Sequence, residues 1–410
     1  MSDLRALNSS LKSAHPSAWA CLSDLGRRLY FPLGIPAQAQ EARACTINAT
    51  IGQITDGHSG AMPLGAMVDP LAQLPPEQVV LYTPTAGNPT LRDLWAERLE
   101  SQGCAPLSSP LVTQGLTHGL SIVADLFVDP DTDVFLPSPG WGNYRHIFET
   151  RRGARVHTYS PVSRTGLDLD AIDSALSSAS PGSVLILNFP SNPIGYSPTE
   201  AEAEALVARI QRHPHPLVVV TDDAYQGMVW EPGLLEGSLF PLLSRGNPSH
   251  ILPIKIDGAT KELFFFGGRI GFLSFGCEGA AGDALEEKGR AIIRSTISSC
   301  STLSQNLVIG ALEDPELPTQ TREMRDQILN RYRQLSEKIT QAGIETWPFN
   351  SAFFVLIPVR SDPESIRQEL LSRGVGVISL PSASAIRLSY ASVAPEDIDG
   401  LVRSLQDVLG

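Results

Sequence analysis

A chain of 410 residues exceeds the size at which one hydrophobic core usually stops growing, about 250 to 300 residues, so we expect two domains. Its net charge of −13 comes from dispersed acidic residues without a polybasic run, which argues against nucleic acid or an anionic membrane surface as the main partner. No apolar run approaches the length needed to span a bilayer, so no membrane segment is expected.

The five cysteines stand at wide and irregular spacings, without a Cys-x-x-Cys pair or a neighbouring pair of histidines. This pattern indicates reduced thiols in a cytoplasmic protein and no metal site. The first thirty residues lack the apolar segment of a secretory signal, and their Ser/Ala-rich composition leaves organelle targeting as the alternative.

Short helical patterns occupy the first 45 residues. Gly52 follows a short apolar stretch, where it would let a substrate approach bare backbone or would simply form a turn. Tyr82 opens a loop rich in proline and glycine and is a candidate contact for an anion. A helix is predicted after this loop, at 90–100.

Short apolar runs then alternate with helical patterns. Strands are predicted at 134–136, 156–159, 184–187, 217–220, 251–256 and 272–275, and helices at 115–127, 167–178 and 199–213. This alternation predicts a largely parallel sheet that is covered by helices on both faces. Ligands of such sheets bind at the carboxyl ends of the strands.

Candidate ligand-binding residues follow several of these strands. Gly115, Leu116 and Thr117 form a strand-to-helix turn whose free N–H groups suit a phosphate, although so short a motif is weak by itself. Trp141 lies in a Pro/Gly-rich loop, where it would stack on a flat ring or belong to the core. Asn192 lies in a similar loop, and a simple turn-forming role is its alternative.

Asp222 and Asp223 follow the strand at 217–220, with Tyr225 shortly after them. A buried carboxylate needs a partner, and a protonated ring nitrogen would be one.

Lys261 and Arg269 lie between the last two predicted strands. Small residues precede Lys261 and aromatic residues follow it, and apolar surroundings lower the pKa of an amine and make it nucleophilic toward an aldehyde. Glycines flank Arg269, so a phosphate could approach the backbone closely while the guanidinium binds it. The ordinary alternative for such a lysine is a solvated surface charge.

Together these residues match the needs of pyridoxal 5'-phosphate. That cofactor requires an anion at its ring nitrogen, donors at its phenolic oxygen, a lysine for its aldehyde, and N–H groups with an arginine for its phosphate.

From about Asn48 to Arg387 the chain resembles the fold type I pyridoxal-phosphate enzymes, and among them the class I aminotransferases of the aspartate and aromatic type. The resemblance rests on SNPIG, DDAY, the Lys261 to Arg269 spacing and AIRLSY, which occur in this order. It implies an α/β fold with a three-layer large domain, a mostly parallel sheet, and a smaller α+β domain built from both chain ends. It also implies a homodimer with shared active sites. We expect an N-terminal segment at 1–50 that belongs to the small domain, a large domain at 51–318, and a C-terminal part at 319–410.

The resemblance also implies roles for single residues. Lys261 would hold the cofactor aldehyde, Asp222 would pair with the ring nitrogen, and Asn192 and Tyr225 would bind the phenolic oxygen. Trp141 would stack on the ring. The phosphate would be surrounded by Gly115, Leu116, Thr117, Thr260 and Arg269, with Tyr82 and Ser298 reaching it across the dimer.

For the substrate, Arg387 would bind the α-carboxylate beside Gly52, Trp141 and Asn192. Arg294 would bind a distal carboxylate, or would be a phosphate-side or surface arginine. Three positions depart from the family pattern, namely Gly258 for a serine, Tyr144 for the histidine that supports the ring-nitrogen aspartate, and Ile194 for a threonine. These departures argue against strict aspartate specificity.

The sequence of the C-terminal quarter predicts a long linking helix at 319–342, a helix at 363–372, strands at 375–378 and around AIRLSY, and a final helix from about residue 395.

From the resemblance we expect a pyridoxal-phosphate-dependent aminotransferase that moves an amino group between an L-amino acid, acidic or aromatic, and a 2-oxo acid such as 2-oxoglutarate. The alternatives are another reaction on the same cofactor, namely β-elimination, racemisation or Cα–Cβ cleavage, and a non-catalytic sensor. No strand is followed by Gly-x-Gly-x-x-Gly, which argues against a nicotinamide dehydrogenase.

Overall fold

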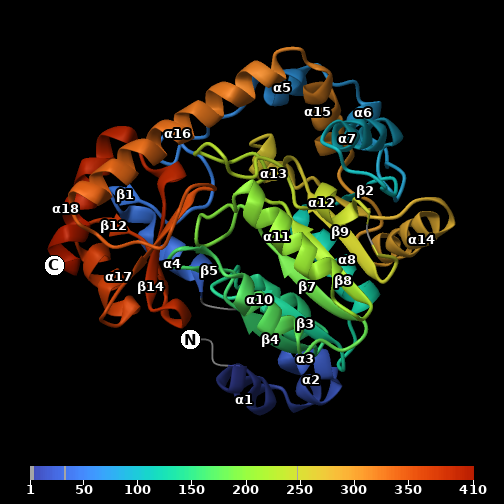
Figure 1. Cartoon of the computed structure of the whole chain (residues 1–410), viewed down its shortest axis with the longest axis horizontal. Helices are drawn as coiled ribbons and strands as arrows, with labels where there is room; N and C mark the ends of the chain where they lie inside the picture. The colour runs from blue at the N-terminus through green and yellow to red at the C-terminus, as the bar shows by residue number, and fades with distance from the viewer. Residues whose placement is uncertain (1–3, 32–33, 247) are drawn as a thin grey trace.

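The computed structural model describes residues 4–31, 34–246 and 248–410 (Figure 1). Its largest sheet has seven strands in the order β2-β10-β9-β8-β7-β3-β4. Every neighbouring pair runs parallel except the two pairs that involve β10. These strands are β2 (Leu111–Thr113), β3 (Asp133–Pro137), β4 (Arg155–Tyr159), β7 (Ser183–Leu187), β8 (Leu217–Asp222), β9 (Ile251–Asp257) and β10 (Gly271–Phe275). The predicted α/β class and mostly parallel sheet are confirmed.

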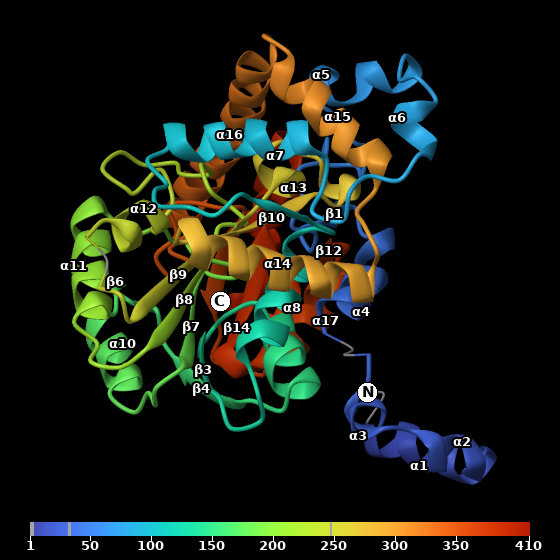
Figure 2. The same ribbon diagram turned by 90° about the vertical axis from the view of Figure 1, so that its right-hand side faces the viewer.

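Helices cover both faces of this sheet (Figure 2). Val218 and Val220 of β8 face the cluster that includes α8 (Leu116–Phe127) and α14 (Gly279–Thr296). The alternate residues, Leu217 and Val219, face α10 (Leu169–Leu176) and α11 (Glu200–Gln211). Because side chains alternate along a strand, burial on both sides explains the continuous apolar runs in the sequence.

The smaller part is built from both ends of the chain. Its sheet has the order β11-β14-β13, and β1 pairs in parallel with β12. These strands are β1 (Ile47–Asn48), β11 (Phe354–Pro358), β12 (Val375–Gly376), β13 (Ile378–Leu380) and β14 (Ala385–Ser389), and the accompanying helices are α4 (Ile35–Glu41), α17 (Pro363–Ser372) and α18 (Ile398–Leu409). The long helix α16 (Leu317–Gln341) arches between the two parts (Figure 1).

The other α-helices and β-strands lie elsewhere along the chain. They are α1 (Leu4–Ala14), α2 (Pro16–Cys21), α3 (Asp24–Arg28), α5 (Gly65–Val68), α6 (Glu77–Val80), α7 (Pro89–Ser101), α9 (Asn143–Arg145), β5 (Val162–Ser163), β6 (Gly166–Leu167), α12 (Phe240–Ser244), α13 (Ala259–Glu262) and α15 (Thr302–Glu313). Among the residues that the structure describes, no helix is both long and apolar enough to cross a membrane.

The first fifty residues contact both parts of the molecule. Arg28 Nε donates to the carbonyl oxygen of Thr150 at 3.2 Å, and the rings of Tyr30 and His146 meet edge to face. These contacts join the start of the chain to the large sheet part, whereas α4 and β1 contact the smaller part. The domain boundaries remain a prediction, and the contacts support a small-domain role only for the segment that begins at α4.

A buried charge network lies next to the carboxyl ends of β8 and β9. Lys255 is fully buried and bonds to Asp223, to Gln226 Oε1 at 2.6 Å and to Asp257 Oδ2 at 3.5 Å. Trp95 Nε1 donates to Asp257 Oδ1 at 3.1 Å. Burial raises the pKa of Asp257 to about 7, and the Lys255 charge opposes this shift. Removing the lysine would leave two buried carboxyl groups without their cation.

We therefore expect Lys255→Met to lower the free energy of unfolding by about 3 to 5 kcal/mol. Urea unfolding at pH 8 would measure this loss, with the exposed Lys288→Met as the matched control. A loss no larger than that of the control would contradict a structural role for the network.

Candidate active site

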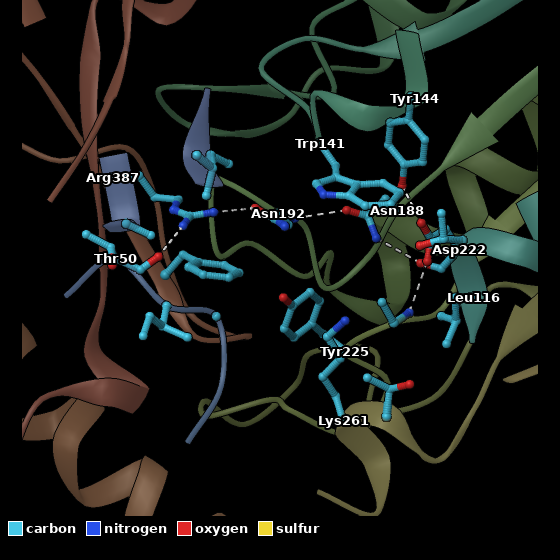
Figure 3. A pocket seen from close by; sticks show the side chains of 18 of the residues that line it. Thr50, Leu116, Trp141, Tyr144, Asn188, Asn192, Asp222, Tyr225, Lys261 and Arg387 are labelled. Carbon is cyan, nitrogen blue, oxygen red and sulfur yellow. Dashed lines mark hydrogen bonds between the residues drawn. The ribbon is translucent and has the colours of Figure 1, made fainter. Parts of the chain in front are cut away.

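The predicted strand-end residues surround one cavity of about 290 Å3. Figure 3 shows Arg387 at one end and Asp222 at the other, with Asn192 and Asn188 between them and Lys261 and Tyr225 on a third side. The lining residues are Ile35, Ala39, Thr50, Ile51, Gly52, Leu116, Thr117, Trp141, Tyr144, Asn188, Asn192, Asp222, Ala224, Tyr225, Thr260, Lys261, Arg269, Phe354 and Arg387.

Asp222 ends β8 and is 4% exposed. The hydroxyl of Tyr144 donates to its Oδ2 at 2.5 Å, and the amide of Ala224 donates to Oδ1 at 3.3 Å. Burial raises the pKa of Asp222 to about 6, and the Tyr144 bond and the Lys261 charge oppose this shift. Burial also raises the pKa of Tyr144, so this phenol stays protonated and donates. Tyr144 thus supports the carboxylate from the position where the resemblance expects a histidine.

Lys261 enters the cavity from the short helix α13, between β9 and β10. Its Nζ lies 5.2 Å from the centroid of the Tyr225 ring. Burial lowers the pKa of Lys261 to about 8; the Asp222 charge opposes this shift and the Arg269 charge adds to it. A larger fraction of this amine is therefore neutral at physiological pH than in a solvated lysine, as a nucleophile requires.

The turn before α8 lies against Arg269. Gly115 has a φ of +74°, and a Cβ at this position would lie 2.4 Å from Arg269 Nη2. The hydroxyl of Thr260 is buried and has no hydrogen-bond partner in the described part of the chain. Helix N–H groups, a guanidinium and an unsatisfied hydroxyl thus meet at one place, which suits a phosphate.

Close backbone packing explains why position 258 is a glycine. A Cβ at this position would lie 2.6 Å from both Gly271 Cα and the Ile270 carbonyl oxygen. The close approach of the β9 and β10 ends therefore excludes the serine that the resemblance expects there.

Arg387 projects from β14 and is 3% exposed. Its Nη2 donates to the Thr50 carbonyl oxygen at 2.8 Å and its Nη1 donates to Asn192 Oδ1 at 3.3 Å, whereas the buried Nε has no partner within residues 4–31, 34–246 and 248–410. Burial lowers the pKa of Arg387 to about 10. No carboxylate of the described residues pairs with it, so the site suits an incoming carboxylate.

Four predicted residues do not line this cavity: Gly115, which lies next to Arg269, and Tyr82, Arg294 and Ser298, which lie farther away. Tyr82 is 95% exposed, and Arg294 Nη1 donates to Ser298 Oγ at 2.5 Å on the surface of α14 and its following turn. Within one chain these last three do not meet the other site residues.

Sequence reasoning also missed residues that line the cavity. Asn188 donates to the backbone oxygen of Asp222 at 2.8 Å, and its Oδ1 accepts from the Asn192 amide at 2.9 Å. Its position directly after the strand at 184–187 was a signal that could have identified it. Ile35, Thr50 and Phe354 come from distant segments and carry no such signal.

Comparison with known proteins agrees with this geometry. The family model described as aminotransferase class I and II matches residues 47–405. The chain belongs to this family.

An aspartate/prephenate aminotransferase of Thermus thermophilus is 28% identical over 340 residues, which cover 80% of this chain and 83% of that protein. An aspartate aminotransferase of Rhizobium meliloti is 28% identical over 241 residues, which cover 57% of this chain and 55% of that protein. An aminotransferase structure from Anaerococcus prevotii superposes with a TM-score of 0.87 at 18% identity, covering 95% of this chain and 99% of that chain, and this likeness shows the fold. The expected enzyme class is confirmed, and the reaction is pyridoxal-phosphate-dependent transamination.

The aminotransferase cavity fits its cofactor. The Thr260 hydroxyl and the Gly115 turn lie near Arg269, and among the described residues no cation forms an ion pair with the buried Asp222 carboxylate. The Lys261 amine and the Trp141 ring line the same cavity. A pyridoxal phosphate would satisfy each of these groups.

Asp222→Asn should stabilise the cofactor-free aminotransferase above pH 6. The folded pKa of about 6 exceeds the unfolded value of 3.8, so the stability from this carboxyl is fully present below pH 3.8 and is lost as the pH rises through 6. The variant should therefore gain up to about 3 kcal/mol over wild type at pH 8.

Urea unfolding of both apoproteins at pH 8 and pH 4.5 would measure this difference, with the exposed Asp283→Asn as the control. A gain that is equal at both pH values would contradict the account.

Proposed function

We propose that this aminotransferase works in the cytoplasm as a homodimer and moves an amino group between an acidic or aromatic L-amino acid and a 2-oxo acid such as 2-oxoglutarate. The observation that carries the proposal is the placement of Asp222, Lys261, Arg269 and Arg387 around one cavity. The names of the Thermus and Rhizobium relatives support an acidic substrate. The five cysteines are unpaired in the structure, which supports a reducing compartment.

Each residue has a role in this reaction. The cofactor supplies an aldehyde for the substrate amine and a ring that accepts the electron pair released at Cα. Arg387 would hold the α-carboxylate through a two-pronged contact. Lys261 Nζ, neutral in its buried position, would then remove the proton from Cα of the amino donor. In the second half of the reaction it would return a proton to the carbon of the 2-oxo acid that becomes Cα of the new amino acid.

Asp222 would keep the ring nitrogen protonated, because a buried carboxylate favours a cationic partner. Burial raises the pKa of Tyr225, so its hydroxyl stays protonated and would donate to the phenolic oxygen together with Asn192. Trp141 would stack on the ring, and Thr260, Arg269 and the Gly115–Thr117 turn would hold the phosphate.

Lys261→Ala tests the catalytic assignment. Removal of the base should lower the rate of conversion to the pyridoxamine form by about a thousandfold or more, for every amino donor. Absorbance would follow the half-reaction, with Lys288→Ala as the lysine control. Conversion at the control rate would refute the assignment. An amino acid that is consumed without forming pyridoxamine would favour elimination, racemisation or Cα–Cβ cleavage instead.

We further propose that Tyr82, Arg294 and Ser298 complete the site of the opposite subunit, with Arg294 binding the distal carboxylate of an acidic substrate. Exposed apolar side chains precede Tyr82, with Val80 73% and Leu81 58% exposed, as an unformed interface would show.

Subunit mixing tests this shared site. Lys261→Ala and Arg294→Ala homodimers should each turn over aspartate poorly, but a mixed dimer would contain one intact site. After random exchange, an equal mixture should recover about a quarter of the wild-type rate with aspartate. No recovery, despite exchange shown by mass spectrometry, would contradict the proposal.

A further inference from the structure

Residues 350–352 join the two parts of the molecule beside the cavity. This segment, which we call the connector, lies between α16 and β11, and Phe354 of β11 lines the cavity. Asn350 is 9% exposed, and Ser351 and Ala352 are fully buried. The connector therefore runs inside the protein, where each of its polar groups needs a hydrogen-bond partner.

One side of the connector binds residues 191–197, which we call the asparagine loop. The Gly195 carbonyl oxygen accepts from the backbone amides of Asn350 at 2.8 Å and of Ser351 at 2.9 Å. The Ser351 hydroxyl donates to the same oxygen at 3.1 Å. Gly195 has a φ of +84°, and a Cβ at this position would lie 2.0 Å from the Phe354 carbonyl oxygen. The loop thus needs a glycine to pack this closely against the connector.

The side chain of Asn350 adds a second attachment to the asparagine loop. Its Oδ1 accepts from the Ser197 amide at 2.8 Å, and its Nδ2 donates to the Ser197 carbonyl oxygen at 3.0 Å. An asparagine suits this place because its amide presents an acceptor and a donor side by side. Since Ser197 is 1% exposed, an alanine at position 350 would leave both of these backbone groups buried without a partner.

The other side of the connector binds the segment that follows Tyr225. The Trp230 amide donates to the Asn350 carbonyl oxygen at 3.0 Å, and the Ala352 amide donates to the Met228 carbonyl oxygen at 2.7 Å. The connector is therefore hydrogen-bonded on both sides, and it holds the asparagine loop in register with the segment that carries Tyr225.

Asn192 is the site residue of the asparagine loop. Its Oδ1 accepts from Arg387 Nη1 at 3.3 Å, and its backbone amide donates to Asn188 Oδ1 at 2.9 Å (Figure 3). Its Nδ2 has no acceptor among the residues that the structure describes. This group is therefore free to donate to the phenolic oxygen of the cofactor.

We propose that Asn350 is a positioning residue for the cofactor, because its bonds to the asparagine loop aim Asn192 Nδ2 at the phenolic oxygen. This inference rests on the proposed function and deepens it. The two donors to that oxygen, Asn192 and Tyr225, come from the two segments that the connector joins. Asn350 itself does not line the cavity, so it acts on the cofactor only through these segments.

A pH titration of the visible absorbance of the holoenzyme tests this role. A donor to an oxygen stabilises its anionic form, so displacement of Asn192 makes the bound cofactor keep its titrating proton to a higher pH. Asn350→Ala should therefore raise the midpoint of the titration by about one pH unit. Asn192→Ala should raise it by a similar amount, because this change removes the donor itself.

The double variant Asn350→Ala/Asn192→Ala shows whether the two residues act on one contact. It should have the midpoint of Asn192→Ala alone, because the loss of the donor leaves nothing for Asn350 to position. Asn330→Ala, on the exposed side of α16, is the asparagine control and should keep the wild-type midpoint.

Hydrogen exchange of the cofactor-free protein gives a second measurement. Asn350→Ala should speed exchange of the amides at 191–197 by about tenfold or more, whereas the amides of β3 should exchange at the wild-type rate. Ser351→Ala removes one of the donors to the Gly195 oxygen. It should change both measurements in the same direction by less, and it provides the test if Asn350→Ala does not fold.

A lower melting temperature of Asn350→Ala with an unchanged midpoint would overturn the positioning role, as would single-variant shifts that add in the double variant. Either result would leave pyridoxamine formation by wild type, and so the proposed function, intact. An unchanged midpoint in Asn192→Ala would contradict the proposed role of Asn192 and the inference with it.

Discussion

Asp222 and Lys261, at the carboxyl edge of the large sheet, and Arg387, on β14 of the smaller sheet, are buried around one cavity, and no ion pair joins any two of them. Desolvation raises the pKa of Asp222 and lowers the pKa of Lys261 and of Arg387, so it favours the neutral form of each group. Such an arrangement is costly in the empty protein and becomes favourable when a ligand brings the complementary charges. A cofactor with a basic ring nitrogen, an aldehyde and a phosphate, followed by a substrate carboxylate, supplies this complement.

Asp222 and Lys261 stay free of ion pairs with each other's neighbours because the acidic residue next to each of them in the chain binds a different cation outside the cavity. Asp222 faces the cavity, whereas Asp223 bonds to Lys255 behind it. Lys261 likewise faces the cavity, whereas Glu262 bonds to Arg98. Because each adjacent acid has its own cation, it does not compete for Lys261, and the pKa of that amine can stay low.

Much of this arrangement was predictable from the sequence, because strand ends were visible as polar residues after apolar runs. Asp222, Lys261, Asn192 and the turn at Gly115 all follow such runs, and the structure places them together. The packing between Gly258 and Gly271 was not predictable, since only the close approach of two backbones excludes a side chain there. The contribution of Ile35 was not predictable for a similar reason, because contacts of α4 with β13 and α17 hold this helix beside the cavity.

The roles of surface residues were also not predictable from the sequence pattern alone. Tyr82 and Arg294 gain a role only from the resemblance, and in one chain they are exposed to solvent. Their proposed role therefore depends on a second subunit.

The central claim is that Lys261, and no other lysine, is the amine that this cavity makes reactive toward the cofactor aldehyde. Borohydride reduction of the holoenzyme, followed by peptide mass spectrometry, tests it most directly. The account predicts a pyridoxyl phosphate label on the segment between Ile256 and Arg269, with fragment ions that locate it on Lys261. Labelling of Lys255 or of a surface lysine in place of Lys261 would contradict it.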